Sequence, residues 1–223
     1  MYFSIANGLV SGISYDLARD LARRANVDLV FEPRPGIQPV IDAVRTNEAE
    51  IGFLANDPSR RGPVLFSRTY LRNPQSAIVP TTTSLQSAAP TGPIPALADL
   101  DRPGHRIAAG RTDSVGLHLA RTLTQATFVP LDDVSVPALT TLFAAGTIDA
   151  FCASRLRLRQ LAAAIAGLRV LPGSLLGVPQ AIIVPANAPA RLAAIDTFLL
   201  AVRDNGLLQA AITRSNTEAE IAE

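Results

Sequence analysis

Two adjacent arginines, Arg60 and Arg61, stand in the stretch NDPSRRGPVLFSRTY, just before a short apolar run. A guanidinium is a planar fork that donates two charge-assisted hydrogen bonds to one carboxylate and stays protonated in proteins. The pair could therefore bind a small anionic molecule. The alternative is that both side chains are solvated at a turn or satisfy the end of a neighbouring helix.

Residue patterns for catalysis or metal binding are missing from the sequence. It contains no G-x-S-x-G nucleophile motif and no glycine-rich phosphate loop. His105 and His118 have no Cys, Asp or Glu at ligand spacing, and the single Cys152 can form no internal disulfide. We therefore expect neither a metal nor another cofactor.

Composition limits the class of protein. The chain has 223 residues, of which 48% are hydrophobic, so it can bury a sizeable core. All 20 basic residues are Arg and the net charge is only +1, which provides no long-range field to hold a polyanion. Nucleic acid is therefore not an expected partner. No apolar run approaches the ~18 residues that a membrane helix needs.

The elements that would position the arginines alternate between helix and strand. Apolar residues four apart predict a first helix, and short apolar runs after each helix predict strands. The first half predicts a helix at 12–27, a strand at 28–33, a helix at 36–50 and strands at 51–55 and 63–67. Such alternation favours an α/β fold with a mostly parallel sheet.

The alternation resumes after a Thr-, Ser- and Pro-rich segment at 81–96, which predicts a loop. The second half predicts strands at 105–110, 127–131, 148–154 and 168–172, and helices at 114–126, 136–146 and 155–167. Two strands of near-identical sequence, SAIVP at 76–80 and QAIIVP at 180–185, have the pattern of a paired crossover. Residues 188–214 predict two helices, with no further strand after them.

Several of these stretches together resemble the extracellular solute-binding proteins of ABC importers, of the type II periplasmic binding fold and the amino-acid-binding family. In order they are GISYDLARDLA, EAEIGFLA, DPSRRGPVLFSRTY, GHRIAAG and AAGTIDAFCAS, which span nearly the whole chain. The resemblance implies a clamshell of two lobes, each a small mostly parallel sheet flanked by helices, joined by two crossover strands. The implied parts are lobe 1 at 1–76 plus 186–223, lobe 2 at 81–180, and hinge strands at 76–80 and 181–185.

In that family the first lobe presents an Arg from the loop before the FS strand, and this Arg binds the carboxylate of an amino acid. Counting back six residues from Phe66 leads to Arg60, which leaves Arg61 without a role in binding. The resemblance therefore implies that Arg60 contacts the ligand.

The same loop, at 54–60, would supply backbone N–H and carbonyl groups to the ligand, Ala55 among them. Asn56 could add a side-chain contact, although Asn-Asp-Pro also forms a good turn without any ligand. Tyr2 stands where relatives carry an aromatic residue that packs on the ligand, but at a chain end it could equally belong to the core.

The second lobe departs from the family pattern in two places. Relatives place a small hydroxyl residue at the start of the helix after the RIA strand, where the helix N-terminus meets the ligand's carboxylate. Here Asp113 falls on that position, between Thr112 and Ser114. Because a carboxylate would repel the ligand, we interpret Asp113 as a helix cap and the two hydroxyl residues as donors.

The second departure concerns the ligand's ammonium group. Relatives carry an Asp five residues beyond the Asp of the IDA motif, and here that position is Ser154. A hydroxyl cannot neutralise an ammonium, so either Asp113 takes that role or the ligand has no ammonium. We interpret Asp149, the Asp of the motif itself, as structural.

The resemblance implies a substrate-binding protein of an ABC transporter. Such a protein traps a small carboxylate-bearing solute, an amino acid or a related organic acid, between its lobes and, as a monomer, presents it to the membrane permease. One alternative is an enzyme similar to cyclohexadienyl dehydratase, with Asp113 as its general acid or base. Another is a ligand-sensing domain of a larger receptor or regulator.

The family also implies a periplasmic location. Relatives begin with a signal peptide and a first strand ahead of the aromatic pair, and this chain has no counterpart of either. We therefore expect its start to be misplaced or trimmed.

Overall fold

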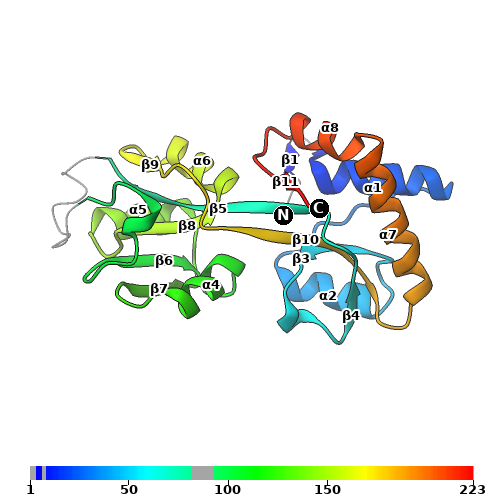
Figure 1. Ribbon diagram of the computed structural model, residues 1–223, viewed down its shortest axis with the longest axis horizontal. Coiled ribbons are helices and arrows are strands. Elements are labelled where there is room, and N and C mark those ends of the chain that lie inside the picture. The colour runs from blue at the N-terminus through cyan, green and yellow to red at the C-terminus, as the bar shows by residue number, and fades with distance from the viewer. Residues whose placement is uncertain (1–3, 7–8, 82–92, 223) are drawn as a thin grey trace. The chain divides into compact units, whose positions relative to one another are not determined.

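The structure is a computed structural model that describes residues 4–6, 9–81 and 93–222 (Figure 1). The chain forms two compact units. Unit 1 comprises Met1–Arg72 and Pro179–Glu223, and unit 2 comprises Asn73–Val178. The chain passes from one unit to the other within two long strands, β5 (Leu71–Pro80) and β10 (Leu176–Pro185). These strands contain the two segments whose similar sequences predicted a crossover.

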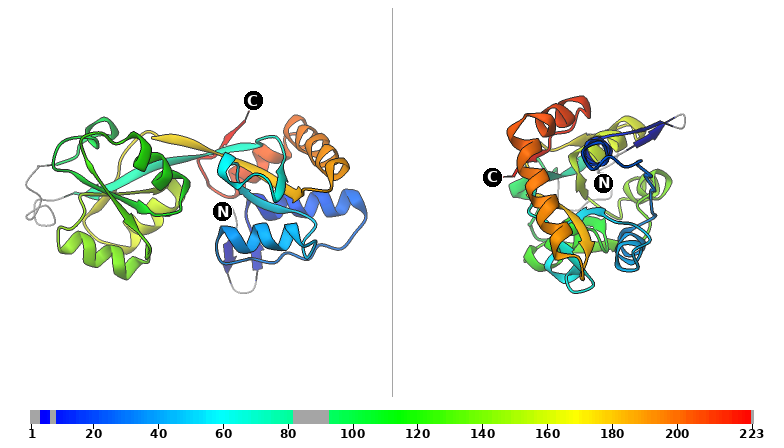
Figure 2. Two further views of the ribbon diagram at one scale, coloured as in Figure 1. Left: turned by 90° about the horizontal axis from the view of Figure 1, so that it is seen from below. Right: turned by 90° about the vertical axis from the view of Figure 1, so that its right-hand side faces the viewer.

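Unit 1 is a sheet covered by helices on both faces. Strand β10 lies in its centre and pairs with β3 and β4, both antiparallel. Helices α1, α7 and α8 pack over one face and α2 covers the other, as Figures 1 and 2 show. Its other elements are β1 (Ser4–Ala6), β2 (Leu9–Ser11), α1 (Ile13–Ala25), α2 (Ile37–Arg45), β3 (Gly52–Ala55), the 3-10 turn η1 (Pro58–Arg60), β4 (Val64–Phe66), α7 (Pro189–Asp204), α8 (Leu207–Arg214) and β11 (Glu220–Ile221).

The core of unit 1 follows from the periodicity of its helices. Ile13 and Leu17, one turn apart on α1, are fully buried against Phe198 of α7 and Leu208 of α8. The exposed positions of α1 include Arg19, Arg23 and Arg24, as an amphipathic surface helix requires. Asp20 is buried, where it accepts hydrogen bonds from Arg23 and Arg24.

Unit 2 is a second sheet with two covered faces. Strand β6 lies between β7 and β8 and is parallel to both, while β5 pairs antiparallel with β8 and β9. Helix α4 covers one face, and α5 and α6 cover the other. Its elements are η2 (Leu97–Asp99), β6 (Arg106–Gly110), α4 (Ser114–Thr122), β7 (Thr127–Leu131), α5 (Val136–Ala144), β8 (Ala150–Ser154), α6 (Arg155–Ala164) and β9 (Leu168–Val170).

The α/β class and the order of elements are confirmed, with corrections to the sheet. Among the described strand pairs only β6–β7 and β6–β8 are parallel, so a mostly parallel sheet in each lobe is wrong. The reason is that the crossover strands β5 and β10 run antiparallel to the neighbours they join. A further strand, β11, does follow the last helix and pairs with β5.

Three predicted elements differ most in extent or type. Residues 28–33 are extended but do not form a strand, and Val27 and Val30 stay 62% and 79% exposed. A strand needs a neighbouring backbone as well as β-branched residues, and this stretch has no ladder partner among the described strands. The helices predicted at 36–50 and 114–126 end early, at Arg45 and Thr122. The predicted loop at 81–96 lies mostly outside the described residues.

Candidate functional site

The Arg60 loop follows directly from strand β3, which ends at Ala55. Asp57 shapes the loop, because its carboxylate accepts hydrogen bonds from the backbone N–H of Ser59 at 2.9 Å and from its hydroxyl at 2.7 Å. Pro58 begins the single 3-10 turn that Arg60 ends. The Arg60 side chain is half-buried, and its Nη1 donates to the carbonyl oxygen of Ala55 at 3.1 Å.

Arg61 lies differently from its neighbour. Its side chain is exposed, and Nη2 lies 3.5 Å from Oδ1 of Asn56. The backbone N–H of Asn56 donates to the carbonyl oxygen of Pro179 at 2.8 Å, which ties the loop to the start of the unit 1 part of β10. The loop thus brings Ala55, Asn56 and Arg60 together. Tyr2, the other predicted contact from this unit, lies outside the described residues.

In unit 2, the start of α4 lies close against the end of β6. A Cβ atom added to Gly116 would stand 2.1 Å from the carbonyl oxygen of Gly110, so only glycine fits at 116. The N-cap residue is Asp113, but its side chain accepts no hydrogen bond from the first turn of α4. The prediction that the Asp113 carboxylate caps the helix is therefore wrong.

The position of Gly110 explains this orientation. A Cβ atom at Gly110 would lie 2.3 Å from Oδ2 of Asp113, so the carboxylate fills the space that a side chain would take. Among the described residues it has no ion-pair partner. The exposed Thr112 and the half-buried Ser114 flank it. A carboxylate is thus available beside the N-terminus of a helix, where the peptide dipole favours negative charge.

Ser154 is the N-cap of α6, at the end of β8. Its hydroxyl accepts a hydrogen bond from the backbone N–H of Arg157 at 3.3 Å. Because β6 and β8 are parallel neighbours, Ser154 and the Thr112–Ser114 stretch follow the carboxyl ends of adjacent strands. Ligands of α/β sheets bind at such edges.

Two buried glutamines near these residues were missed by the sequence reasoning. Gln75 stands opposite Ser154 in the β5–β8 pair, and Gln180 stands opposite Ala55 in the β3–β10 pair. Their side chains are only 6% and 8% exposed. The available signal was a Pro-Gln dipeptide ahead of each apolar run, in NPQSAIVP and VPQAIIVP.

The sequence profile of the bacterial extracellular solute-binding proteins, family 3, matches residues 1–215. The chain belongs to this family. By that description its members are extracellular proteins that bind solutes. A comparison with curated protein sequences finds no significant match.

Solved structures have the same fold as this solute-binding protein. An amino acid ABC transporter substrate-binding protein from Streptococcus pneumoniae, bound to L-arginine, is 17% identical with a TM-score of 0.71 over 96% of this chain and 88% of its own. A putative ABC transporter binding component from Wolinella succinogenes, complexed with lysine, is 22% identical with a TM-score of 0.73 over 96% and 89%. The GluR0 ligand-binding core from Nostoc punctiforme, in complex with L-glutamate, is 20% identical with a TM-score of 0.67 over 94% and 92%.

The structural role of Asp149 in this solute-binding protein is confirmed. Its carboxylate is 7% exposed and accepts three hydrogen bonds from Arg106, at 2.7 Å from the backbone N–H, 3.0 Å from Nε and 2.9 Å from Nη2. The hydrogen bond from Arg106 to Asp149 is the main cause that raises the pKa of the guanidinium. The pair joins the starts of β6 and β8, away from the strand ends that carry Ser154.

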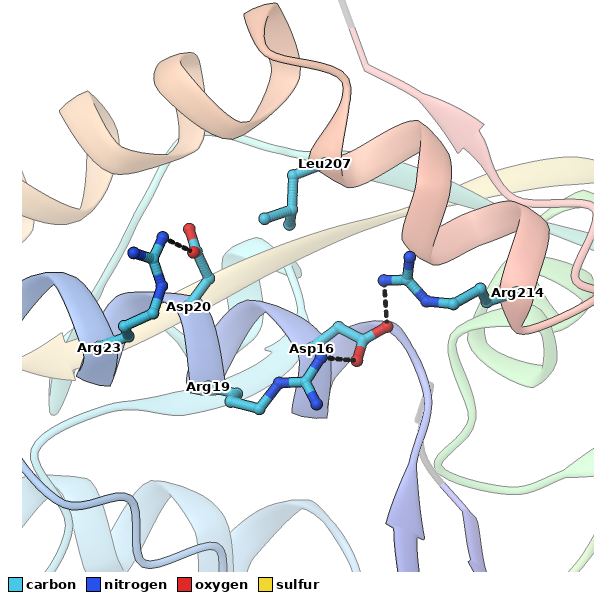
Figure 3. Close-up of a pocket in the computed structure, with 6 residues that line it drawn as sticks. All are labelled: Asp16, Arg19, Asp20, Arg23, Leu207 and Arg214. Carbon is cyan, nitrogen blue, oxygen red and sulfur yellow. Dashed lines mark hydrogen bonds and ion pairs between the residues drawn. The ribbon is translucent and has the colours of Figure 1, made fainter.

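A charged pocket of about 310 Å³ lies between α1 and α8 in unit 1 (Figure 3). Asp16 accepts from Arg19 at 3.3 Å and from Arg214 at 2.8 Å, and Asp20 accepts from Arg23 at 2.6 Å. Although burial opposes the effect, hydrogen bonds from Arg23 and Arg24 lower the pKa of Asp20. These guanidiniums already bind carboxylates of the protein, so the pocket is a poor candidate for an anionic solute.

Clusters of metal-binding side chains and membrane-spanning helices are both absent from the described residues. Within residues 4–6, 9–81 and 93–222, no three potential metal-binding side chains gather in one place. In the same part of the chain, no helix combines the length and apolarity needed to cross a bilayer.

Proposed function

We propose that this protein binds a small carboxylate-bearing solute, an amino acid or a related organic acid, and delivers it to the membrane permease of an ABC transporter. The observation that carries the proposal is the half-buried Arg60 on the loop after β3, in a chain of the solute-binding family. Its guanidinium would bind the solute carboxylate through paired hydrogen bonds. The ligands named for the similar structures, arginine, lysine and glutamate, all carry such a carboxylate.

Each unit would contribute its own contacts to the solute. Unit 1 would supply Arg60, backbone groups of Ala55 and the side chain of Asn56. Unit 2 would supply Thr112 and Ser114 as hydroxyl donors, and Ser154 at the start of α6. These groups can orient a small polar molecule without any covalent chemistry, so binding is the whole activity.

The Asp113 carboxylate would set the preference of the site for solutes with or without an ammonium group. A helix cap would hold its carboxylate in hydrogen bonds to the first turn of α4. No such hydrogen bond is present, so the carboxylate remains available to a ligand. A carboxylate in that place would attract an ammonium and repel a second carboxylate. This supports an amino acid over a dicarboxylic acid as the solute.

The protein would act as a monomer in the periplasm. Fractionation of the cells that produce it tests this location, and recovery in the cytoplasmic fraction would contradict it.

Thermal unfolding in the presence of amino acids, keto acids and dicarboxylates tests the solute class. A ligand that binds only the folded protein stabilises it by about 2.7 kcal/mol at 100 times its dissociation constant. We expect at least one amino acid to raise the melting temperature. If none of the three classes does, the proposal is wrong.

The available Asp113 carboxylate also favours one second candidate, an enzyme similar to cyclohexadienyl dehydratase, because such an enzyme needs a general acid or base. Mass spectrometry of the same compounds after incubation separates the two. A binding protein returns every compound unchanged, whereas conversion that an Asp113→Asn variant abolishes would establish the enzyme.

A further inference from the structure

Unit 2 contains a buried carboxamide whose oxygen the fold leaves unused. Gln75 of β5 is only 6% exposed, and its Nε2 donates to the carbonyl oxygen of Asn73 at 3.0 Å. Because a backbone carbonyl can only accept, this hydrogen bond sets the orientation of the amide and turns Oε1 away from Asn73. Among the described residues nothing donates to Oε1. Gln75 therefore presents an acceptor at a fixed place.

The Oε1 atom of Gln75 is in contact with solvent. In the part of the chain that the structure describes, the fully buried polar atoms without a partner belong to other residues. The strand around Gln75 is firmly held, since its backbone oxygen accepts from the N–H of Leu175 at 2.8 Å and from the hydroxyl of Ser174 at 3.2 Å. A ligand would therefore meet the Gln75 oxygen in its present position.

Ser154 stands directly opposite Gln75 in the β5–β8 pair. The Cβ atoms of such partners lie about 4.5 to 5.5 Å apart, on the same face of the sheet. The Ser154 hydroxyl accepts from the N–H of Arg157 at 3.3 Å, and among the described residues it donates to nothing. The two side chains thus present one acceptor and one donor next to each other.

The Gln75–Ser154 pair lies on the face of the sheet that α4 covers. Ala77 of β5 and Cys152 of β8, each two residues from the pair, belong to the core beneath α4 together with Val115. Side chains two residues apart along a strand share a face. Ser154 ends β8, so the pair stands at the same edge as the Thr112–Ser114 stretch, where ligands of α/β sheets bind.

The charged groups nearest in the chain are engaged elsewhere. Arg155, at the start of α6, donates to the carbonyl oxygen of Gly173 at 2.5 Å. The Asp113 carboxylate fills the space on the Cβ side of Gly110, and by alternation this is the face of Ala108, which packs under α5 and α6. The pair itself is neutral, so an ionised group bound there would lose water without gaining a counter-charge.

We propose that Gln75 and Ser154 are the contact on unit 2 that selects the solute, and that they bind an uncharged carboxamide. The amide N–H of the solute donates to Oε1 of Gln75, and its carbonyl oxygen accepts from the Ser154 hydroxyl. A carboxamide has both groups on one carbon and no charge to desolvate. This inference rests on the proposed function and narrows the solute to an amino acid with an amide side chain.

Isothermal titration with L-glutamine and L-glutamate tests the proposal, because the two molecules differ only in the amide. L-asparagine and L-aspartate form a second matched pair with a shorter side chain. We expect the natural protein to bind the amide of at least one pair about tenfold or more tightly than the acid, because the site gives the second carboxylate no counter-charge. Equal affinity within both pairs, or preference for the acids, overturns the proposal.

Substitution of Gln75 tests the contact itself. Gln75→Leu keeps the size of the side chain and removes the acceptor, so we expect the preferred amide to bind about fivefold or more weakly. Gln75→Glu places a carboxylate at the position of Oε1, and the affinity for L-lysine relative to the amide is expected to rise about tenfold. A Gln75→Glu variant that keeps the natural preference overturns the proposal, even if Gln75→Leu does not fold.

Ser76→Ala is the matched control. Ser76 is the next residue of β5, on the opposite face, and its hydroxyl donates to the carbonyl oxygen of Leu171 at 2.9 Å. The substitution removes a buried hydrogen bond from the same strand, and we expect it to keep the preference for the amide. Loss of that preference in Ser76→Ala as well as in Gln75→Leu would assign the effect to the strand and overturn the proposal.

Failure of this inference can be told from failure of the proposed function. Arg60→Ala is expected to weaken the binding of amide and acid alike, because both carry the carboxylate that Arg60 binds, whereas Gln75→Leu changes their ratio. If amino acids bind the natural protein without preference for an amide, only the present inference is wrong. If no amino acid binds it, both are wrong.

Discussion

The Nη1 of Arg60 donates a hydrogen bond of 3.1 Å to the carbonyl oxygen of Ala55, which fixes the guanidinium at the end of β3. Arg61, the next residue, is exposed, and its side chain reaches only Asn56 among the described residues, at 3.5 Å. We expect Arg60→Ala to lose the solute-induced rise in melting temperature and Arg61→Ala to keep most of it. Isothermal titration on the two variants measures this directly. Equal losses in both would mean that the loop acts through its net charge alone.

The carboxylate of Asp113 is expected to pair with the ammonium of an amino acid. Asp113→Asn should then weaken amino-acid binding about tenfold or more, since a hydrogen bond to a charged group contributes about 1.5 to 3 kcal/mol. Binding of the matching keto acid should not weaken. Asp132→Asn is the control, because Asp132 is bound to Arg111 at 2.6 Å, at the end of the adjacent strand β7. An unchanged preference between the two ligands would show that the solute has no ammonium near Asp113.

Gly116→Ala is expected to displace the start of α4. Its Cβ would stand 2.1 Å from the backbone oxygen of Gly110, which cannot rotate away. We expect a destabilisation of about 1 to 3 kcal/mol in urea unfolding, together with weaker solute binding because Thr112 and Ser114 move with the helix. Gly62→Ala serves for comparison, because nothing lies within 4 Å of a Cβ there and only its positive φ of 114° is strained. Gly62→Ala should lose stability without a change in α4. Unchanged stability and solute binding in Gly116→Ala would contradict the packing argument.

Asp149→Ala is expected to destabilise unit 2 without a direct effect on solute binding. The substitution removes the acceptor of three hydrogen bonds from Arg106 and leaves a half-buried guanidinium unpaired. Breaking such a pair costs about 3 kcal/mol. The more exposed Asp132–Arg111 pair provides the comparison, and Asp132→Ala should change the free energy of unfolding little. A similar loss of unfolding free energy in both variants would show that burial does not determine how much each ion pair contributes to stability.

Asp101 makes unit 2 sensitive to acid. Backbone N–H groups of Ala126, Gln125 and Thr124 donate to its carboxylate, and these hydrogen bonds hold its pKa well below the usual range. Because the folded pKa is lowered, the stabilisation is fully present above the unfolded pKa of about 3.9 and is lost as the pH falls below it. The melting temperature of the natural protein should exceed that of Asp101→Asn at pH 7, and the difference should shrink progressively as the pH falls from about 4 toward the lowered pKa of the folded state. A pH-independent difference would contradict this account.

Helices proved easier to predict from this sequence than strands. The apolar residues of α1 recur one turn apart, and this pattern depends only on the helix itself. Residues 28–33 contain a short apolar run, Leu29, Val30 and Phe31, but a strand also depends on a neighbour that the local sequence does not describe. The two-residue strand β11 is too short for any periodicity.

For the candidate site, position along the chain was predictable and orientation was not. Asp113 and Ser154 both stand at helix N-caps after strand ends, as the sequence indicated. Only Ser154 accepts a hydrogen bond from its helix, because Asp113 turns toward the space left by Gly110. Which way a side chain turns depends on a glycine three residues away, and this is a property of packing that residue types alone do not contain.

The division of unit 1 into two sequence segments reverses the order in which the parts can fold during synthesis. Its core requires Ile182 and Val184 of β10 and Phe198 of α7, which are translated after the whole of unit 2. Residues 73–178 are continuous and can therefore complete their core while the first 72 residues, made earlier, still wait for a partner. On the ribosome, the last-made helices complete the first-made domain.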